Sequence, residues 1–148
     1  MDLSDQQVIE APRDRVYAAL NDPQVLQACI PGCKSITKIS DTELEAEMGL
    51  KIGPVKATFK TSINLTNLNP PESYTLVGEG KAGAAGFAKG SADVKLTENG
   101  DHTLLEYGVQ ASIGGKIAQV GGRLMESTSR KLAADFFKKF SEVVQEAA

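Results

Sequence analysis

Residues 114–140 read GGKIAQVGGRLMESTSRKLAADFFKKF, and this stretch decides the fold because helical spacing begins in it. Its apolar residues recur at steps of three and four positions, which places them on one face of a helix. The residues of this face are Ile117, Val120, Leu124, Met125, Thr128, Leu132, Phe136, Phe140 and Val143. At about 1.5 Å per residue, the last roughly thirty residues are expected to form one helix of roughly 45 Å.

Upstream of this helix, from residue 33 to residue 113, apolar residues recur at every second position instead. In TELEAEMGLKI (residues 42–52) the even positions are apolar, and most of the odd positions hold glutamate or lysine. This period predicts antiparallel strands with one dry face and one wet face. Turn signals divide the region into six strands, and they fall at Asp41, Gly53-Pro54, residues 69–71, residues 83–86 and residues 99–101.

The N-terminal part adds one more strand and two short helices. Residues 3–9 predict a strand, although a polar one. Pro12 is expected to open the first helix, because proline suits the first helical position. Asp22 is the expected N-cap of the second helix, with Pro23 at its first position. The chain therefore predicts an α+β protein with a single domain over residues 1–148.

A curved antiparallel sheet of seven strands, wrapped around one long C-terminal helix, is the helix-grip architecture. One helix cannot fill the concavity of such a sheet, so we expect a cavity between the two. Apolar cavities with a few polar groups are frequent ligand sites. We predict that the lining and portal of this cavity are formed by Tyr17, Leu20, Leu26, Ile30, Phe59, Ile63, Phe87, Tyr107, Val109, Ile117, Val120, Gly121 and Leu124.

Glycines before the long helix raise the question of a nucleotide site. Residues 114–122 do not match a phosphate-binding loop, because Ile117 follows Lys116 where that motif needs serine or threonine. A helix N-terminus with a lysine nearby can still hold an anionic or carbonyl head group, but the favoured interpretation is that residues 114–115 form the strand-to-helix turn and that Lys116 is solvated. Gly121 and Gly122, taken as helix-interior glycines, either allow close packing against the sheet or leave room for a ligand. In the second case, this half of the helix is a candidate gate, while Phe136, Phe137 and Phe140 clamp the other half onto the sheet.

A second glycine-rich stretch, VGEGKAGAAGFAKG at residues 77–90, has two interpretations. It is either a hairpin whose small residues permit bending and bulges, or a portal at one end of the sheet with Phe87 as its apolar plug.

The sequence offers no convincing catalytic constellation, so we expect a protein that is not an enzyme. His102, the one histidine, falls in the turn ENGDHT and is expected to be exposed. Tyr17, Tyr107 and Cys29 can reach a cavity, but we interpret them as lining rather than as an acid or a nucleophile. No spacing of histidine, cysteine and carboxylate residues indicates a metal site, and no cofactor is expected.

Composition narrows the range of partners. A formal net charge of -3 and the absence of tryptophan argue against nucleic-acid binding. No apolar run has the length of a membrane span, and the polar N-terminus does not resemble a signal peptide. We therefore expect a cytoplasmic protein, in which Cys29 and Cys33 are thiols rather than a disulfide.

Five segments together resemble the family of the G subunit of carbon monoxide dehydrogenase. They are NDPQVLQACIPGC (21–33), GPVKATFK (53–60), PPESYTLVGEGK (70–81), GFAKGSA (86–92) and GGKIAQVGGRL (114–124). The resemblance covers essentially the whole chain. It implies a START-like, polyketide-cyclase-like helix-grip domain with an apolar cavity, and association with molybdenum hydroxylases of the carbon monoxide dehydrogenase type. Family members often carry a C-terminal extension proposed to tether them to the membrane, and this sequence ends at Ala148. Transient, peripheral contact with the inner face of the membrane is therefore expected rather than permanent anchoring.

These observations lead to three hypotheses about function. The first is non-catalytic binding or carriage of a hydrophobic ligand, a lipid or an isoprenoid quinone, which links a molybdenum hydroxylase to the membrane quinone pool. The second is an assembly or recruitment module for such a dehydrogenase without ligand carriage. The third is a small cyclase-type enzyme, which the lack of an acid–base pair disfavours.

Overall fold

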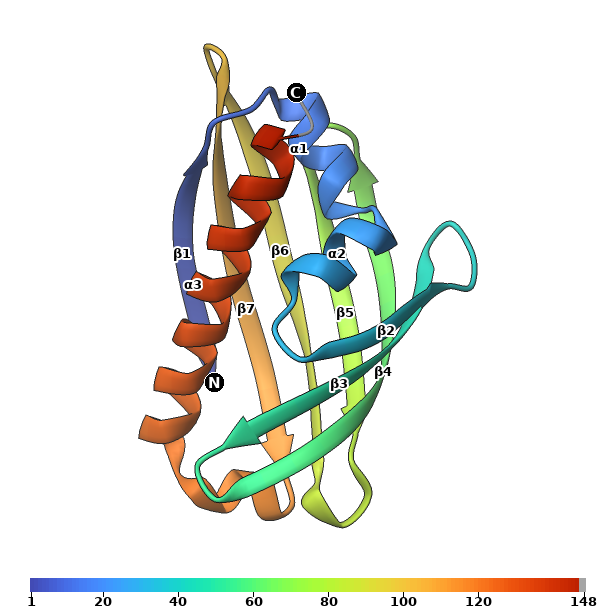
Figure 1. Cartoon of the computed structure of the whole chain (residues 1–148), viewed down its shortest axis with the longest axis vertical. Helices are drawn as coiled ribbons and strands as arrows, with labels where there is room; N and C mark the ends of the chain where they lie inside the picture. The colour runs from blue at the N-terminus through green and yellow to red at the C-terminus, as the bar shows by residue number, and fades with distance from the viewer. Residues whose placement is uncertain (147–148) are drawn as a thin grey trace.

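The computed structural model describes residues 1–146, which form a strongly curved sheet that wraps around a C-terminal helix (Figure 1). The elements in chain order are β1 (Asp2–Ile9), α1 (Arg13–Leu20), α2 (Pro23–Cys29), β2 (Cys33–Lys38), β3 (Glu43–Ile52), β4 (Val55–Asn69), β5 (Ser73–Lys81), the 3-10 turn η1 (Gly83–Ala85), β6 (Phe87–Asn99), β7 (His102–Gly114), the 3-10 turn η2 (Lys116–Val120) and α3 (Gly122–Glu146).

The strands of residues 1–146 form one antiparallel sheet with the order β1-β7-β6-β5-β4-β3-β2. β1 therefore closes the sheet beside the last strand, while β2 to β7 follow one another as a meander. In Figure 1, β2, β3 and β4 cross in front of the upright β5 to β7, which shows how far the sheet bends. The predicted α+β helix-grip fold is confirmed, and all five predicted turns lie between strands.

The short helices begin close to where the sequence places them. The Asp22 carboxylate accepts a hydrogen bond from the backbone N–H of Gln24 at 2.9 Å, and Pro23 is the first residue of α2. This N-cap is confirmed. Pro12 has an extended backbone (φ -62°, ψ 148°) and precedes the first residue of α1 instead of occupying that position. Because the ring fixes only φ, proline suits either place.

The prediction of one unbroken helix from residue 117 onward is wrong. α3 has 25 residues and starts at Gly122. Gly121 has φ 94° and ψ 154°, a conformation almost restricted to glycine, and it separates α3 from η2. The apolar spacing continues across this break because Ile117, on η2, is also buried. Gly121 is thus a link between two helical elements and not a helix-interior residue.

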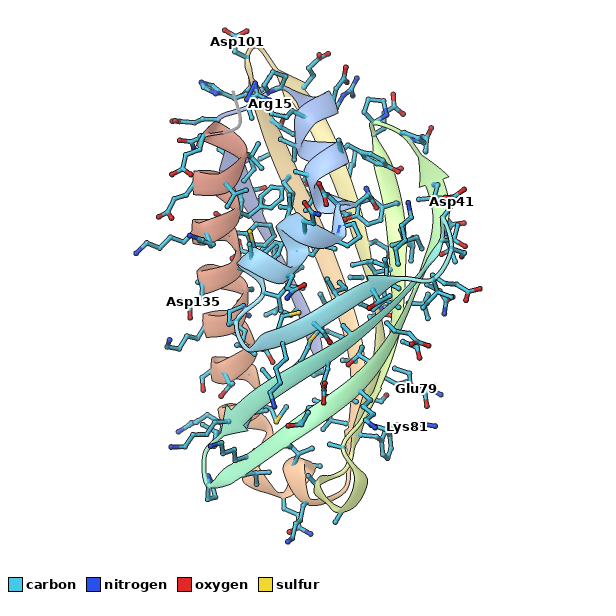
Figure 2. All side chains as sticks on the ribbon, turned by 45° about the vertical axis from the view of Figure 1, so that its right-hand side comes forward. Arg15, Asp41, Glu79, Lys81, Asp101 and Asp135 are labelled. Atoms are coloured by element: carbon cyan, nitrogen blue, oxygen red, sulfur yellow. The ribbon has the colours of Figure 1, made fainter. Side chains whose placement is uncertain are left out.

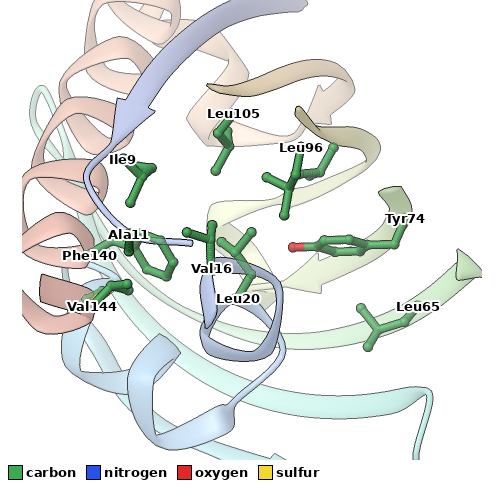
Figure 3. Packing of buried hydrophobic residues seen from close by; sticks show 12 residues of the cluster. Ile9, Ala11, Val16, Leu20, Leu65, Tyr74, Leu96, Leu105, Phe140 and Val144 are labelled. Carbon is green, nitrogen blue, oxygen red and sulfur yellow. The ribbon is translucent and has the colours of Figure 1, made fainter. Parts of the chain in front are cut away.

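The C-terminal half of α3 is fixed in the main hydrophobic core. Phe140 and Val144 are almost completely buried (0% and 1% exposed) among residues of α1 and the sheet, such as Val16 and Leu105 (Figure 3). Phe137 stacks on Tyr107 of β7 with 5.3 Å between ring centroids. The predicted aromatic clamp is confirmed.

A second, smaller hydrophobic cluster lies toward the other end of the sheet. Its buried residues are Ile52, Phe59 and Ile117, and Val120 and Leu124 pack against it. The domain therefore has two apolar clusters, one beneath each end of the helical segment.

We predict that Phe140→Ala lowers the free energy of unfolding by about 3–5 kcal/mol, because it removes a ring from a fully packed site. Urea denaturation followed by circular dichroism measures this change. Phe87→Ala is the matched control: its ring is 45% exposed, so the cost should stay below about 1 kcal/mol. Equal losses for the two variants would contradict the assignment of the clamp.

Candidate ligand cavity

A cavity of about 370 Å³ lies between the concave face of the sheet and the N-terminal half of α3. It occupies the space between the two hydrophobic clusters, since its walls include members of both. The helical wall consists of Ile117, Met125, Thr128, Ser129 and Leu132, and the sheet contributes from β3 to β7. The inward residues of the sheet include Met48, Leu50, Ile52, Phe59, Thr61, Ile63, Leu76, Val109, Ala111 and Ile113.

Small residues at consecutive inward positions create this space. Gly78 of β5 pairs with Gly90 of β6, and Gly80 pairs with Ala88. All four line the cavity, and their neighbours in the same strands, such as Val77, point to the outer face. Large side chains at these positions would fill the concavity. The cavity thus follows from glycine and alanine on the dry face.

The glycine-rich stretch at residues 77–90 lies in the predicted hairpin, which β5 and β6 form. β5 and β6 pair in continuous register from Ser73↔Lys95 to Lys81↔Phe87, so the glycines do not produce a bulge between them. A Cβ added to Gly80 would lie 3.0 Å from Thr61 Oγ1 and 3.4 Å from Phe59 Cδ1, which are atoms of the cavity wall. These glycines set the depth of the cavity.

The inner surface of the cavity is neutral. Its polar side chains are the hydroxyls of Thr61, Thr128 and Ser129, with Ser91 at the margin. Glu79 and Lys89 border it through the backbone, because both are exposed and alternate with inward glycine and alanine residues. Among residues 1–146, no ionisable side chain from the dry face of the sheet or from α3 lines the cavity.

All three methionines of the chain, Met1, Met48 and Met125, line the cavity. The Met1 Sδ lies 3.6 Å from the Ser129 hydroxyl, which donates to it, and the N-terminal amine donates to the Ala111 carbonyl at 2.7 Å. Met1 therefore spans the gap between β7 and α3. Unbranched thioether side chains adapt to irregular shapes, so three of them make this wall deformable.

The tyrosines considered as acids lie outside the cavity, in the main core. The Tyr17 hydroxyl donates to the Ser73 carbonyl at 3.4 Å, and the Tyr107 ring stacks on Phe137. Burial raises the pKa of the Tyr107 hydroxyl, and the Asp5 carboxylate raises it further, whereas Arg130 lowers it. Burial also raises the pKa of the Tyr17 hydroxyl. Both phenols therefore remain protonated at neutral pH.

The other chemical candidates are equally remote. Burial raises the pKa of the Cys29 thiol, so the cysteine stays protonated, and His102 is exposed at the start of β7. Cys29 and Cys33 are both free thiols. No group of three or more histidine, cysteine or carboxylate side chains that could hold a metal ion occurs within residues 1–146.

The structure brings together only part of the predicted lining. Phe59, Ile63, Val109 and Ile117 line the cavity. The remaining predicted residues lie elsewhere: Tyr17, Leu20 and Tyr107 in or against the main core, Leu26 and Ile30 half-buried at α2, Val120 and Leu124 against the second cluster, and Phe87 and Gly121 exposed. These residues could contact a ligand only if the cavity extended further than it does in this structure.

Sequence reasoning missed the small residues and Met1, whereas it placed Met48 on the dry face of the sheet and Met125 on the apolar face of the helix. The signal was present for Gly78, Gly80, Ala88 and Gly90, since the strand alternation that placed Ala92 inward also places these residues inward. Met125 and Thr128 were on the predicted helix face. No signal in the sequence joined Met1 to this site, because its position depends on the pairing of β1 with β7.

Comparison with known proteins identifies the family of this chain. The family model for the G subunit of carbon monoxide dehydrogenase (CoxG) matches residues 6–145. This chain belongs to the CoxG family. A search of curated proteins gave no match.

Solved structures agree with the CoxG fold. A conserved protein from Geobacillus kaustophilus is 30% identical over 99% of this chain and 97% of its own, with a TM-score of 0.93. A START superfamily protein from Mycobacterium smegmatis (12% identity, 99% of both chains, TM-score 0.76) and the ZhuI aromatase/cyclase from Streptomyces sp. R1128 (10% identity, 98% and 93%, TM-score 0.70) share the fold. The START-like architecture expected of a CoxG family member is therefore present.

Within residues 1–146 of this CoxG family member, none of the helices combines the length and the hydropathy required to cross a membrane.

The two candidate openings of the cavity predicted from the sequence lie at one place. Gly86, next to Phe87, and Gly115, before η2, approach so closely that a Cβ added to Gly115 would lie 2.5 Å from the Gly86 Cα. Whether this end opens as a gate stays a prediction.

The two glycines before α3 should respond differently to substitution. Gly121→Ala forces a Cβ into a glycine-specific conformation and should lower the free energy of unfolding by about 1–3 kcal/mol. Gly122→Ala places a methyl group in open space at the first residue of α3, so the change should stay within about 0.5 kcal/mol. Thermal or urea unfolding measures both values. If the two variants were equally stable, the break at Gly121 would not be a structural requirement.

Proposed function

We propose that this protein binds a neutral hydrophobic ligand, a lipid or an isoprenoid quinone, in the cavity beneath α3, without catalysing a reaction on it. The observation that carries the proposal is a cavity of about 370 Å³ whose inward side chains are apolar apart from a few hydroxyls. Sites of about 300–1,000 Å³ with a few placed polar groups are typical of small-molecule binding. Membership of the CoxG family and the START-like fold support a ligand-binding or accessory role.

The absence of an inward charged side chain in the described part of the chain favours a neutral ligand over a fatty acid. A carboxylate taken out of water needs a cation or several hydrogen-bond donors near it. The inward side chains offer only hydroxyl donors, those of Thr61, Thr128 and Ser129, and the N-terminal amine of Met1 already donates to the Ala111 carbonyl. A hydroxyl can donate to a quinone or ester carbonyl, so these residues would orient such a group within an otherwise apolar space.

The size of the cavity limits how much of the ligand it encloses. A volume of about 370 Å³ is near the lower end of the range for ligand pockets. A quinone with a long isoprenoid chain would therefore place its ring or the first part of its tail inside, while the rest continues past the cavity. The three methionines allow the wall to adjust to either part.

A carrier suits this site better than a cyclase does. General acid–base catalysis needs a titratable group within hydrogen-bond reach of the substrate. Tyr17, Tyr107 and Cys29 lie outside the cavity, and burial raises the pKa of each. The dehydrogenase named in the family description is the proposed user of the ligand. A bound quinone would be delivered to that enzyme as its electron acceptor, linking it to the membrane quinone pool.

Filling the cavity tests the proposal. Gly78→Val adds a branched side chain to the inner face, where an added Cβ has ordinary contact distance to its nearest atom, the Ser62 carbonyl oxygen at 3.8 Å. We expect native mass spectrometry to show the wild-type protein carrying a lipophilic adduct, or taking up added quinone or lipid. Gly78→Val should hold at least about tenfold less, since its side chain occupies part of a small, close-walled site.

Gly108→Val is the matched control. Gly108 lies in the middle of β7 between inward residues, and its added Cβ would meet open space on the outer face. This variant should bind as the wild type does, and both variants should remain folded, because valine suits strands. Protein that never takes up a lipid or quinone, or equal loss in both variants, would contradict ligand binding in this cavity.

A further inference from the structure

Three connections meet at the end of the molecule beyond the cavity. They are the β3–β4 turn, the β5–β6 turn that contains η1, and the β7–α3 connection that contains η2 (Figure 1). We call residues 50–57, 81–89 and 113–124 the basic tip. Its parts are in contact: a Cβ added to Gly53 would lie 2.8 Å from Leu124 Cδ2, and one added to Gly86 would lie 2.1 Å from the Gly114 carbonyl oxygen.

The basic tip has a charge opposite to that of the rest of the chain. It holds six of the sixteen basic side chains and none of the nineteen acidic ones, which leaves ten basic against nineteen acidic residues elsewhere. The six are Lys51, Lys56, Lys81, Lys89, Lys116 and Arg123. Figure 2 shows Lys81 at this end and Asp101 at the opposite end of the molecule. The tip is therefore a positively charged surface on a protein whose remainder is acidic.

The positive charges of the tip are not balanced within the fold. Among residues 1–146, the one ion pair that involves a tip cation joins Lys81 to Glu79 at 3.7 Å, just outside the tip. Lys51 and Lys56 face each other directly across the β3–β4 hairpin. Like charges at such positions are destabilising, so folding alone does not account for this arrangement.

Apolar groups are exposed among these cations. The Phe87 ring is 45% exposed, and Pro54 and Ala84 are exposed in the two turns. A groove of about 610 Å³ runs between the turns, with Val55, Val120 and Leu124 in its apolar part and Lys56 and Lys116 at its margin. Val55, Val120 and Leu124 also pack on Phe59 and Ile117, which line the cavity. One layer of side chains thus separates the groove from the cavity.

The kind of cation indicates the kind of partner. Lysine is depleted in protein–protein interfaces, whereas aromatic residues, methionine and arginine are enriched there. Five of the six tip cations are lysine and one is arginine, so the cations of the tip favour a lipid surface over a protein partner. Lysines near an anionic lipid surface are each attracted by a roughly similar energy, without a need for exact geometry. Small apolar side chains between them can enter the headgroup region.

We propose that the basic tip docks on an anionic membrane surface, with the groove and the near end of the cavity turned toward the lipid. The inference rests on the proposed function for its purpose, since a ligand taken from the bilayer would enter at this end. The docking itself follows from the charge and the exposed apolar groups of the tip. The excess of acidic residues elsewhere keeps the opposite end of the molecule away from the same surface.

Vesicle flotation tests the docking. The full chain is mixed with vesicles of phosphatidylcholine alone or of phosphatidylcholine and phosphatidylglycerol in equal parts. The salt is about 0.01 M or about 0.15 M, between which the Debye length falls from roughly 30 Å to roughly 8 Å. We expect binding to the anionic vesicles that weakens with salt, and little binding to the neutral ones. Lys56→Glu with Lys116→Glu should weaken it at least about 25-fold, or roughly fivefold for each lysine removed.

Lys38→Glu with Lys138→Glu is the matched control, because both side chains are exposed and lie outside the tip. It makes the same change of net charge and should lower vesicle binding much less. Phe87→Ala should weaken binding with no change in its salt dependence. The proposal is overturned by no binding to anionic vesicles at low salt, by equal binding to neutral vesicles, or by equal loss in the two double variants.

The same samples separate this proposal from the ligand proposal. Native mass spectrometry of the Lys56→Glu, Lys116→Glu variant should show the lipophilic adduct at wild-type level, because neither residue lines the cavity. Ligand uptake without charge-dependent vesicle binding would overturn the docking and leave the ligand site. Charge-dependent vesicle binding by a protein that never holds a ligand would support the docking and contradict the ligand site.

Discussion

The packing of Phe140 and Val144 into the main core is the contact on which the rest of the structure depends. It holds one end of α3 against the sheet, and the other end lies over a part of the sheet where glycine and alanine residues leave space. A single helix cannot satisfy a concave sheet along its whole length, so one part of the concavity is a packed core and the other an opening. The stacking of Phe137 on Tyr107 marks the core side of this division.

The second constraint is the set of small residues on the inner face of β5, β6 and β7. Gly78, Gly80 and Gly90 lie where the dry face of a sheet ordinarily presents branched or aromatic residues. Glycine inside a strand weakens it, and this cost is accepted at several adjoining positions. Because the same positions border the basic tip, the structure combines an uncharged cavity with a positively charged, partly apolar end. Ligand site and docking surface are then parts of a single arrangement.

The sequence predicted the fold well because apolar residues at every second position directly indicate which side of a strand faces the core. The residues of β3 from Leu44 to Ile52 are an example. The prediction failed at Gly121, since a 3-10 turn and an α-helix share apolar steps of three and four, and the positive φ that separates them has no signal beyond glycine itself. It located the cavity only in part. Tyr17 and Leu20 face inward as expected, but α3 covers them with its anchored half. That distinction depends on where the helix crosses the sheet, which no local pattern specifies.

The proposed neutral hydrophobic ligand would occupy the space beneath the N-terminal half of α3. Methyl-labelled methionine gives the most direct test by NMR, because the three methionines of the chain all line that space. On titration with a short-chain isoprenoid quinone, the account predicts that the signals of Met1, Met48 and Met125 shift together and saturate at one ligand per protein. Binding of the quinone with the signals of Met48 and Met125 unchanged would contradict it.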